Sequence, residues 1–248
     1  MIQLQSINLG YGKRCLIKDA SAVFHQGVLT ALIGRNGTGK STLLRAMAGL
    51  GQGIQGSIRL DKQSLADIEA QDLARMVSFV STERVRIANL RCCDVVALGR
   101  APYTNWIGSM QEEDKDIVCQ SLERVGMASY AQRTMNHMSD GECQRIMIAR
   151  ALAQQTPIML LDEPTSFLDM PSRYELADLL ASLAHAEKKC IVFSTHELDI
   201  ALALSDTIAL IDSPQLIHLP VAAMQQSGHL ERLFHGSRYP MAAKSREK

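Results

Sequence analysis

Short apolar runs alternate along the chain with segments whose apolar residues recur at helical spacing. Residues 41–48 carry apolar side chains three and four positions apart, and residues 198–204 have a helical composition. Four runs have the length and composition of strands buried on both faces, as in parallel sheets: residues 28–33, 158–161, 190–194 and 207–211. The alternation of such strands with helices predicts an α/β core.

Two parts of the chain depart from this alternation. Short alternating runs in the first 30 residues, broken by Gly10 and Gly12, and a further run at residues 57–60 predict antiparallel strands. Residues 111–125 place an acidic start before apolar residues at helical spacing, which suits a helix and its dipole. We therefore expect a small N-terminal antiparallel sheet and a mainly helical insert between about residues 85 and 155.

Residues 34–41 read Gly-Arg-Asn-Gly-Thr-Gly-Lys-Ser and fit the phosphate-binding pattern G-x-x-x-x-G-K-[ST] without a mismatch. Glycines let the backbone turn tightly and point its N–H groups inward at a helix N-terminus, where anions bind. Lys40 can then reach the terminal phosphates, and the Ser41 hydroxyl can ligate Mg²⁺. An ordinary glycine loop before a helix would not explain the Lys-Ser pair. The nucleotide-binding residues predicted here are Gly34, Asn36, Gly37, Gly39, Lys40, Ser41 and Thr42.

Two carboxylates end the apolar run at residues 158–161. An acidic residue at this place, here Asp162, can hold Mg²⁺ through water, and the adjacent Glu163 can take a proton from an attacking water. The alternative is a pair of acids that only ends a strand. The phosphate-binding loop upstream favours the functional interpretation.

Residues 138–142 read Met-Ser-Asp-Gly-Glu and begin another predicted helix. Ser139 followed three residues later by Glu142 is a capping box, and a well-started helix would explain both residues. It would not explain Gly141, or the position of this segment some 20 residues before the acidic pair.

With these motifs the chain resembles the ATP-binding subunits of ATP-binding cassette (ABC) transporters. Residues 138–142 correspond to the family's LSGGQ signature, residues 166–169 to its D-loop, His196 to its switch histidine and Tyr11 to an aromatic residue that stacks on adenine. Position alone leaves two alternatives open: His196 could have a purely structural role, and Tyr11 could belong to the hydrophobic core. The resemblance covers about residues 2–213.

The resemblance implies a P-loop NTPase (RecA-like) core within an α/β fold, with an N-terminal antiparallel β subdomain and an inserted α-helical subdomain. It implies one ABC ATPase domain over residues 1–248. The parts expected are a core with its β subdomain at 1–84 and 155–213, a helical signature subdomain at 85–154 and a C-terminal extension at 214–248.

The resemblance also implies the chemistry. Two chains would pack head to tail, so that each ATP lies between the P-loop of one chain and Ser139, Gly141 and Glu142 of the other. Glu163 would be the general base, His196 and Lys40 would act on the terminal phosphate, and Asp169 would couple the two sites. Expected partners are a second ATPase subunit, integral membrane permease subunits and, through them, a substrate-binding protein.

One position departs from the family pattern. The stretch at residues 74–82 usually ends in a glutamine that reaches Mg²⁺ and water, but this chain has Thr82 followed by Glu83. The Thr82 hydroxyl is expected to accept from a water that binds Mg²⁺, so Thr82 joins Ser41 and Asp162 as a metal-site residue.

Residues 94–103 contain Leu-Gly-Arg-Ala-Pro, which resembles the importer branch that serves iron-siderophore, haem and cobalamin uptake. The alternative is that Gly99, Arg100 and Pro102 only shape a loop. We expect an importer ATPase, with Tyr103 and Trp106 near a permease groove. An ABC ATPase of another transporter class and a soluble cluster-assembly ATPase remain alternatives.

Composition narrows the partners and the location. The 26 basic residues balance 26 acidic ones, which argues against a nucleic-acid partner. No apolar run approaches a membrane span, and the first residues lack the features of a signal peptide. The six cysteines show no metal-like spacing. A peripheral protein at the cytoplasmic face of the cell membrane is expected.

Overall fold

The central sheet contains the four predicted buried strands. The computed structural model describes residues 1–11, 14–83, 89–104 and 110–234, without the side chains of residues 11 and 234. Within these residues the central sheet has six strands in the order β10-β9-β3-β8-β7-β6, all parallel except the edge strand β10. They are β3 (Val28–Gly34), β6 (Val77–Val80), β7 (Ile158–Leu161), β8 (Cys190–Ser194), β9 (Thr207–Asp212) and β10 (Gln215–Pro220).

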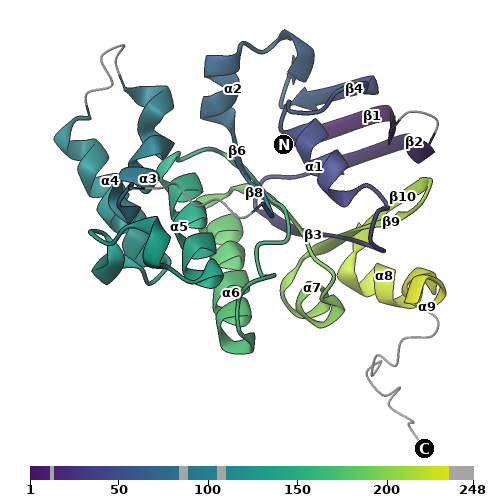
Figure 1. The fold of residues 1–248 in the computed structure, drawn as a ribbon. Helices are drawn as coiled ribbons and strands as arrows, with labels where there is room; N and C mark the ends of the chain where they lie inside the picture. Colours follow the sequence, from purple (N-terminus) through teal and green to yellow (C-terminus); the bar gives the residue numbers. More distant parts are fainter. Residues whose placement is uncertain (12–13, 84–88, 105–109, 235–248) are drawn as a thin grey trace, which may run out of the picture.

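A second, antiparallel sheet is formed mainly by the N-terminal segment (Figure 1). In the described residues its strands follow the order β2-β1-β4-β5, with Ile2 paired to Phe24 on one side and to Leu60 on the other. The strands are β1 (Ile2–Tyr11), β2 (Arg14–Phe24), β4 (Gln55–Leu60) and β5 (Gln63–Ser64). This is the predicted antiparallel β subdomain.

Helices cover both faces of the central sheet. Helix α1 (Lys40–Met47) lies between the two sheets, where Leu43 and Leu44 share a core cluster with Leu32 of β3. Helix α6 (Met170–Glu187) and helix α7 (Leu198–Leu204) pack on the other face of β3. Alternate residues of β3 thus enter different cores, which is why its sequence is apolar apart from Thr30.

The helical insert stands at the β6 edge of the sheet (Figure 1). Helices α3 (Cys92–Ala97), α4 (Glu112–Arg124) and α5 (Asp140–Ala153) pack on one another, and α5 also packs on β6. Short 3₁₀ turns connect them: η2 (Leu98–Tyr103), η3 (Ala128–Tyr130) and η4 (Met135–His137). We propose that the insert ends at the boundary expected near residue 155; the other expected boundary, at residue 85, lies outside the described residues.

Several elements were not predicted from the sequence. They include β6, β10, the long helix α6 and four elements not yet named: η1 (Leu65–Asp67), α2 (Ala70–Met76), α8 (Val221–Gln226) and α9 (His229–Phe234). The predicted α/β P-loop fold with its two additions is confirmed. None of the helices in the described residues combines the length and the apolar character needed to cross a bilayer.

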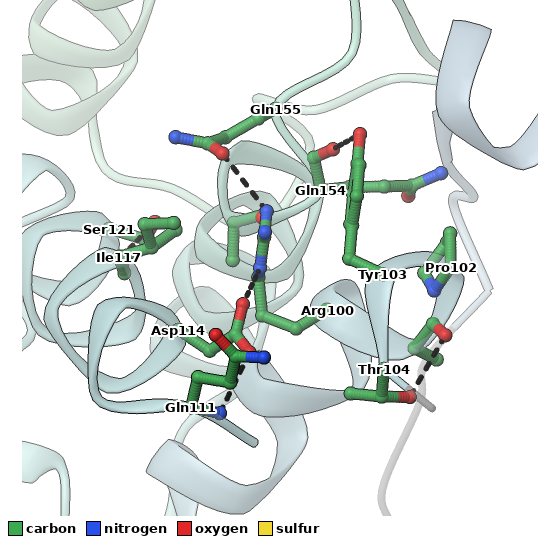
Figure 2. A network of polar contacts seen from close by, with 12 residues as sticks. Arg100, Pro102, Tyr103, Thr104, Gln111, Asp114, Ile117, Ser121, Gln154 and Gln155 are labelled. Carbon is green, nitrogen blue, oxygen red and sulfur yellow. Dashed lines mark hydrogen bonds and ion pairs between the residues drawn. The ribbon is translucent and has the colours of Figure 1, made fainter. Parts of the chain in front are cut away.

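A buried arginine of η2, Arg100, links α4 to the end of α5 (Figure 2). The Arg100 guanidinium donates to Asp114 Oδ1 at 2.8 Å, to the Ala153 carbonyl at 2.8 Å and to Gln155 Oε1 at 3.0 Å. It also lies 4.1 Å from the ring centroid of Tyr103. The hydrogen bond from Arg100 holds the pKa of Asp114 below its usual value. The Leu-Gly-Arg-Ala-Pro segment is therefore an anchor within the fold.

Replacing Arg100 with Met should destabilise the protein by about 3–5 kcal/mol, because the buried Asp114 would lose its charged partner. Urea unfolding measures this. Arg100→Met combined with Asp114→Leu should recover part of the loss, whereas Lys115→Met in the exposed Lys115–Glu112 pair should change little. An Arg100→Met cost below about 1 kcal/mol would contradict the anchoring role.

Candidate nucleotide-binding and hydrolysis site

The phosphate-binding loop connects β3 to α1. Strand β3 ends at Gly34 and α1 begins at Lys40, so the loop delivers its N–H groups to a helix N-terminus as predicted. Gly37 and Gly39 have φ angles of 76° and 109°, which side chains rarely tolerate. A Cβ at residue 39 would also lie 3.2 Å from Leu16 Cβ. The glycines are thus required by the backbone and by close packing.

Lys40 is buried, with 6% of its surface exposed, and its Nζ donates to the Gly34 carbonyl at 2.9 Å. Burial lowers its pKa, while Glu163 and Asp162 oppose that shift through their charges. Burial disfavours the charged ammonium, and phosphate oxygens would stabilise it through charge-assisted hydrogen bonds.

The loop and α1 border a cavity of about 430 Å³. The predicted residues on its wall are Asn36, Gly37, Gly39, Lys40, Ser41, Thr42 and Glu163. Arg14 and Leu16 of β2 also line it, and Arg14 Nη2 donates to the Gly37 carbonyl at 3.4 Å. These two residues were not predicted, because their strand lies far from the loop in sequence. The Tyr11 side chain, predicted to stack on adenine, lies outside the described residues.

The acidic pair follows β7 at the end of the sheet nearest the loop. Asp162 is 1% exposed, and its Oδ2 accepts from Thr82 Oγ1 at 2.9 Å while its Oδ1 accepts from Ser194 Oγ at 2.7 Å. Glu163 lines the cavity and has a left-handed backbone with φ of 48°. Ser41 and Asp162 provide the hard oxygen ligands that suit Mg²⁺, so these side chains fit that ion.

His196 lies beside the acidic pair, beyond the end of β8. Its Nδ1 is 3.7 Å from Glu163 Oε2, and about half of its side chain is exposed. The next residue, Glu197, pairs with Arg173 at 2.5 Å and accepts from Thr165 Oγ1 at 3.2 Å. These contacts connect the segment of His196 and Glu197 to residues 165–173, which contain the predicted D-loop.

The signature segment caps α5. Ser139 Oγ accepts from the Glu142 N–H at 3.2 Å, and Glu142 Oε2 accepts from the Ser139 N–H at 2.8 Å and from its hydroxyl at 2.9 Å. The capping box is therefore real, and the bond from the Ser139 N–H lowers the pKa of Glu142. Residue 141 is a glycine for a separate reason, because a Cβ there would lie 2.9 Å from the Phe167 carbonyl oxygen.

The signature residues line a different cavity from the P-loop. This second cavity, of about 470 Å³, is bordered by Ser139, Gly141, Glu142 and the D-loop residues 167–169. Among the described residues, no residue lines both cavities. Within one chain, the structure therefore does not bring together the two halves of the predicted nucleotide site.

Residues 82 and 83 occupy the place of the missing glutamine. Thr82 bonds to Asp162, whereas the exposed Glu83 pairs with Arg45 of α1 at 2.6 Å.

Ser194 was not singled out in the sequence. The signal that could have identified Ser194 is its position as a polar residue at the end of an otherwise apolar strand.

A glycine-rich loop between a parallel strand and a helix, with a buried acid at the end of a neighbouring strand, defines a P-loop nucleotide-binding ATPase. The ABC transporter family model matches residues 17–166. The chain belongs to the ABC transporter family, and it is an ATPase that binds ATP with Mg²⁺.

Known proteins extend this assignment. A petrobactin import ATP-binding protein of Bacillus anthracis is 35% identical, over 87% of this chain and 79% of its own length. An inward-facing structure of a transporter described as metal-chelate type has a TM-score of 0.82 at 27% identity, covering 94% of this chain and 88% of its own. A dimeric bacterial ABC transporter cassette has a TM-score of 0.78 at 26% identity, covering 89% and 99%.

Proposed function

We propose that this chain is the ATPase subunit of a membrane importer for iron-siderophore, haem or cobalamin-type substrates. The observation that carries the substrate class is the similarity of the chain to a petrobactin import protein and to a metal-chelate transporter. The Leu-Gly-Arg-Ala-Pro segment at residues 98–102 agrees with it, although the same segment also anchors the fold. An ABC ATPase of another transporter class, or of the cluster-assembly type, is the alternative.

In the proposed site, each side chain has a defined task. Backbone N–H groups of the loop and Lys40 bind the phosphates, and Thr42, Asn36 and the glycines shape the pocket. Ser41 and Asp162, with Thr82 through a water, hold Mg²⁺, which neutralises phosphate charge when bound. Glu163 accepts the proton of the attacking water, and His196 orients the terminal phosphate.

Two copies of the chain form the complete site in this proposal. The separate cavities support it, because the signature residues have no phosphate to bind in their own chain. The N-terminus of α5, with Ser139 and Gly141, would face the terminal phosphate held by the partner's P-loop, and Glu142 would release Ser139 to do so. The similarity to a dimeric cassette agrees with this arrangement.

We place the permease contact on the face where η2 meets α2. Arg75 of α2 donates to the Pro102 carbonyl at 2.9 Å, and the neighbouring Leu98 and Tyr103 are exposed apolar residues. Such a surface fits an amphipathic helix from a membrane subunit. Trp106, expected here too, lies outside the described residues. The chain would sit at the cytoplasmic face of the membrane, and a substrate-binding protein would act through the permease.

A crosslinking experiment tests the importer proposal. Ala101→Cys places a thiol on the exposed η2 surface, and Ala223→Cys on α8, at the opposite edge of the sheet, is the matched control. Both variants carry Ser in place of the exposed Cys15 and Cys119. In native membranes, Ala101→Cys should capture an integral membrane protein and Ala223→Cys should not. Capture of soluble proteins alone would contradict the importer and support the cluster-assembly alternative.

A further inference from the structure

Strand β7 lies between β6 and β8, and the residue that follows β7 is Asp162. One hydroxyl from each neighbouring strand or its following loop donates to the Asp162 carboxylate. Thr82 comes two residues after the end of β6 and donates to Asp162 Oδ2 at 2.9 Å. Ser194 is the last residue of β8 and donates to Asp162 Oδ1 at 2.7 Å. Both oxygens of one buried carboxylate are thus held, one from each side.

Ser194 acts on both members of the acidic pair. Its side chain is fully buried, and its hydroxyl oxygen accepts from the Glu163 N–H at 2.9 Å while its hydrogen goes to Asp162. Glu163 has φ of 48°, a left-handed conformation that is unfavourable for a non-glycine residue. The bond from Glu163 to Ser194 helps to hold this turn, which sets the direction of the Glu163 side chain.

Thr82 is itself held in place. The next residue, Glu83, pairs with Arg45, which lies one helical turn after Ser41 on α1. The segment after β6 thus contacts Asp162 through the Thr82 hydroxyl and, more weakly, the helix that carries Ser41 through this exposed ion pair. A threonine side chain is too short to replace a glutamine at a metal, but it is long enough to orient the acid that binds the metal.

We propose that Thr82 and Ser194 are positioning residues that form a hydroxyl clamp on Asp162, in a chain that has Thr82 in place of the glutamine that reaches Mg²⁺ and water in the family. The inference rests on the proposed roles of Asp162 and Glu163. Each carboxylate oxygen has two lone pairs, so each can accept a hydroxyl hydrogen and still bind the metal or its water. Fixing the carboxylate beforehand removes the cost of ordering it when Mg²⁺ arrives.

The first test measures Mg²⁺ binding separately from nucleotide binding. Thr82→Val keeps the shape of the side chain and removes the hydroxyl. In EDTA, a fluorescent ATP analogue should bind Thr82→Val as tightly as it binds the native protein. The Mg²⁺ concentration that gives the half-maximal change in binding of this analogue should rise about 10–100-fold in Thr82→Val. Thr82→Ser should restore the native Mg²⁺ dependence, because it restores the donor.

Ser194→Ala removes the second half of the clamp and should raise the Mg²⁺ requirement similarly, with kcat falling more than the KM for ATP changes. Ser78→Ala is the matched control, since Ser78 is a fully buried hydroxyl of β6 that bonds to Thr156 at 3.0 Å and not to the acidic pair. If Ser194→Ala fails to fold, the Thr82→Val and Thr82→Ser pair decides.

The outcomes distinguish failure of the clamp proposal from failure of the proposed role of Asp162 in binding Mg²⁺. Native protein that binds and hydrolyses ATP with Mg²⁺, together with variants whose Mg²⁺ dependence is unchanged, overturns the clamp alone. An equal shift in Ser78→Ala overturns it as well, because the effect would then follow from any buried hydroxyl. Native protein whose nucleotide binding and hydrolysis ignore Mg²⁺ instead overturns the proposed role of Asp162.

Discussion

With Glu163 replaced by Gln, the protein should still bind ATP and Mg²⁺ but hydrolyse ATP about 10²–10⁴-fold more slowly, because a positioned general base contributes roughly that factor. The amide has the same shape and cannot accept the proton of water. ATP that joins the P-loop of one copy to the signature segment of another would then persist. Size-exclusion chromatography with ATP and Mg²⁺ should show a dimer that native protein forms only transiently.

The control for this experiment is Glu113→Gln on α4, an exposed carboxylate that lines neither cavity. It should hydrolyse ATP at the native rate and form no lasting dimer. A Glu163→Gln protein that binds ATP and yet elutes as a monomer at all concentrations would contradict the shared site. Undiminished hydrolysis would instead contradict the assignment of Glu163 as the base.

The buried strands and the P-loop were predictable because local sequence specifies them. Strands β3, β7, β8 and β9 are mainly apolar, since their alternate residues enter different cores. Helix α6 was missed although its buried residues, such as Leu176, Leu180 and Leu183, follow helical spacing after an Asp169 cap. Strand β6 is short and interrupted by Ser78, a polar residue that is buried because Thr156 satisfies it.

The finer parts of the site depend on strand order, which the sequence pattern does not contain. Thr82 and Asp162 are 80 residues apart, and they meet only because β6 and β7 are neighbours. Ser194 reaches Asp162 because β8 lies on the other side. Gly141 was noticed as unexplained by capping, and its reason, the Phe167 carbonyl, likewise appears only in three dimensions.

Lys40→Met should weaken ATP binding roughly 10–150-fold, since a hydrogen bond to a charged group contributes about 1.5–3 kcal/mol. The same change should not destabilise the nucleotide-free fold, because burial lowers the Lys40 pKa and the charged ammonium is therefore a cost before phosphate arrives. Calorimetric titration with ATP and urea unfolding without it measure the two effects, with the exposed Lys62→Met as the control. Native ATP affinity in Lys40→Met would contradict phosphate binding by this lysine. A large loss of stability without ATP would show that Lys40 serves the fold.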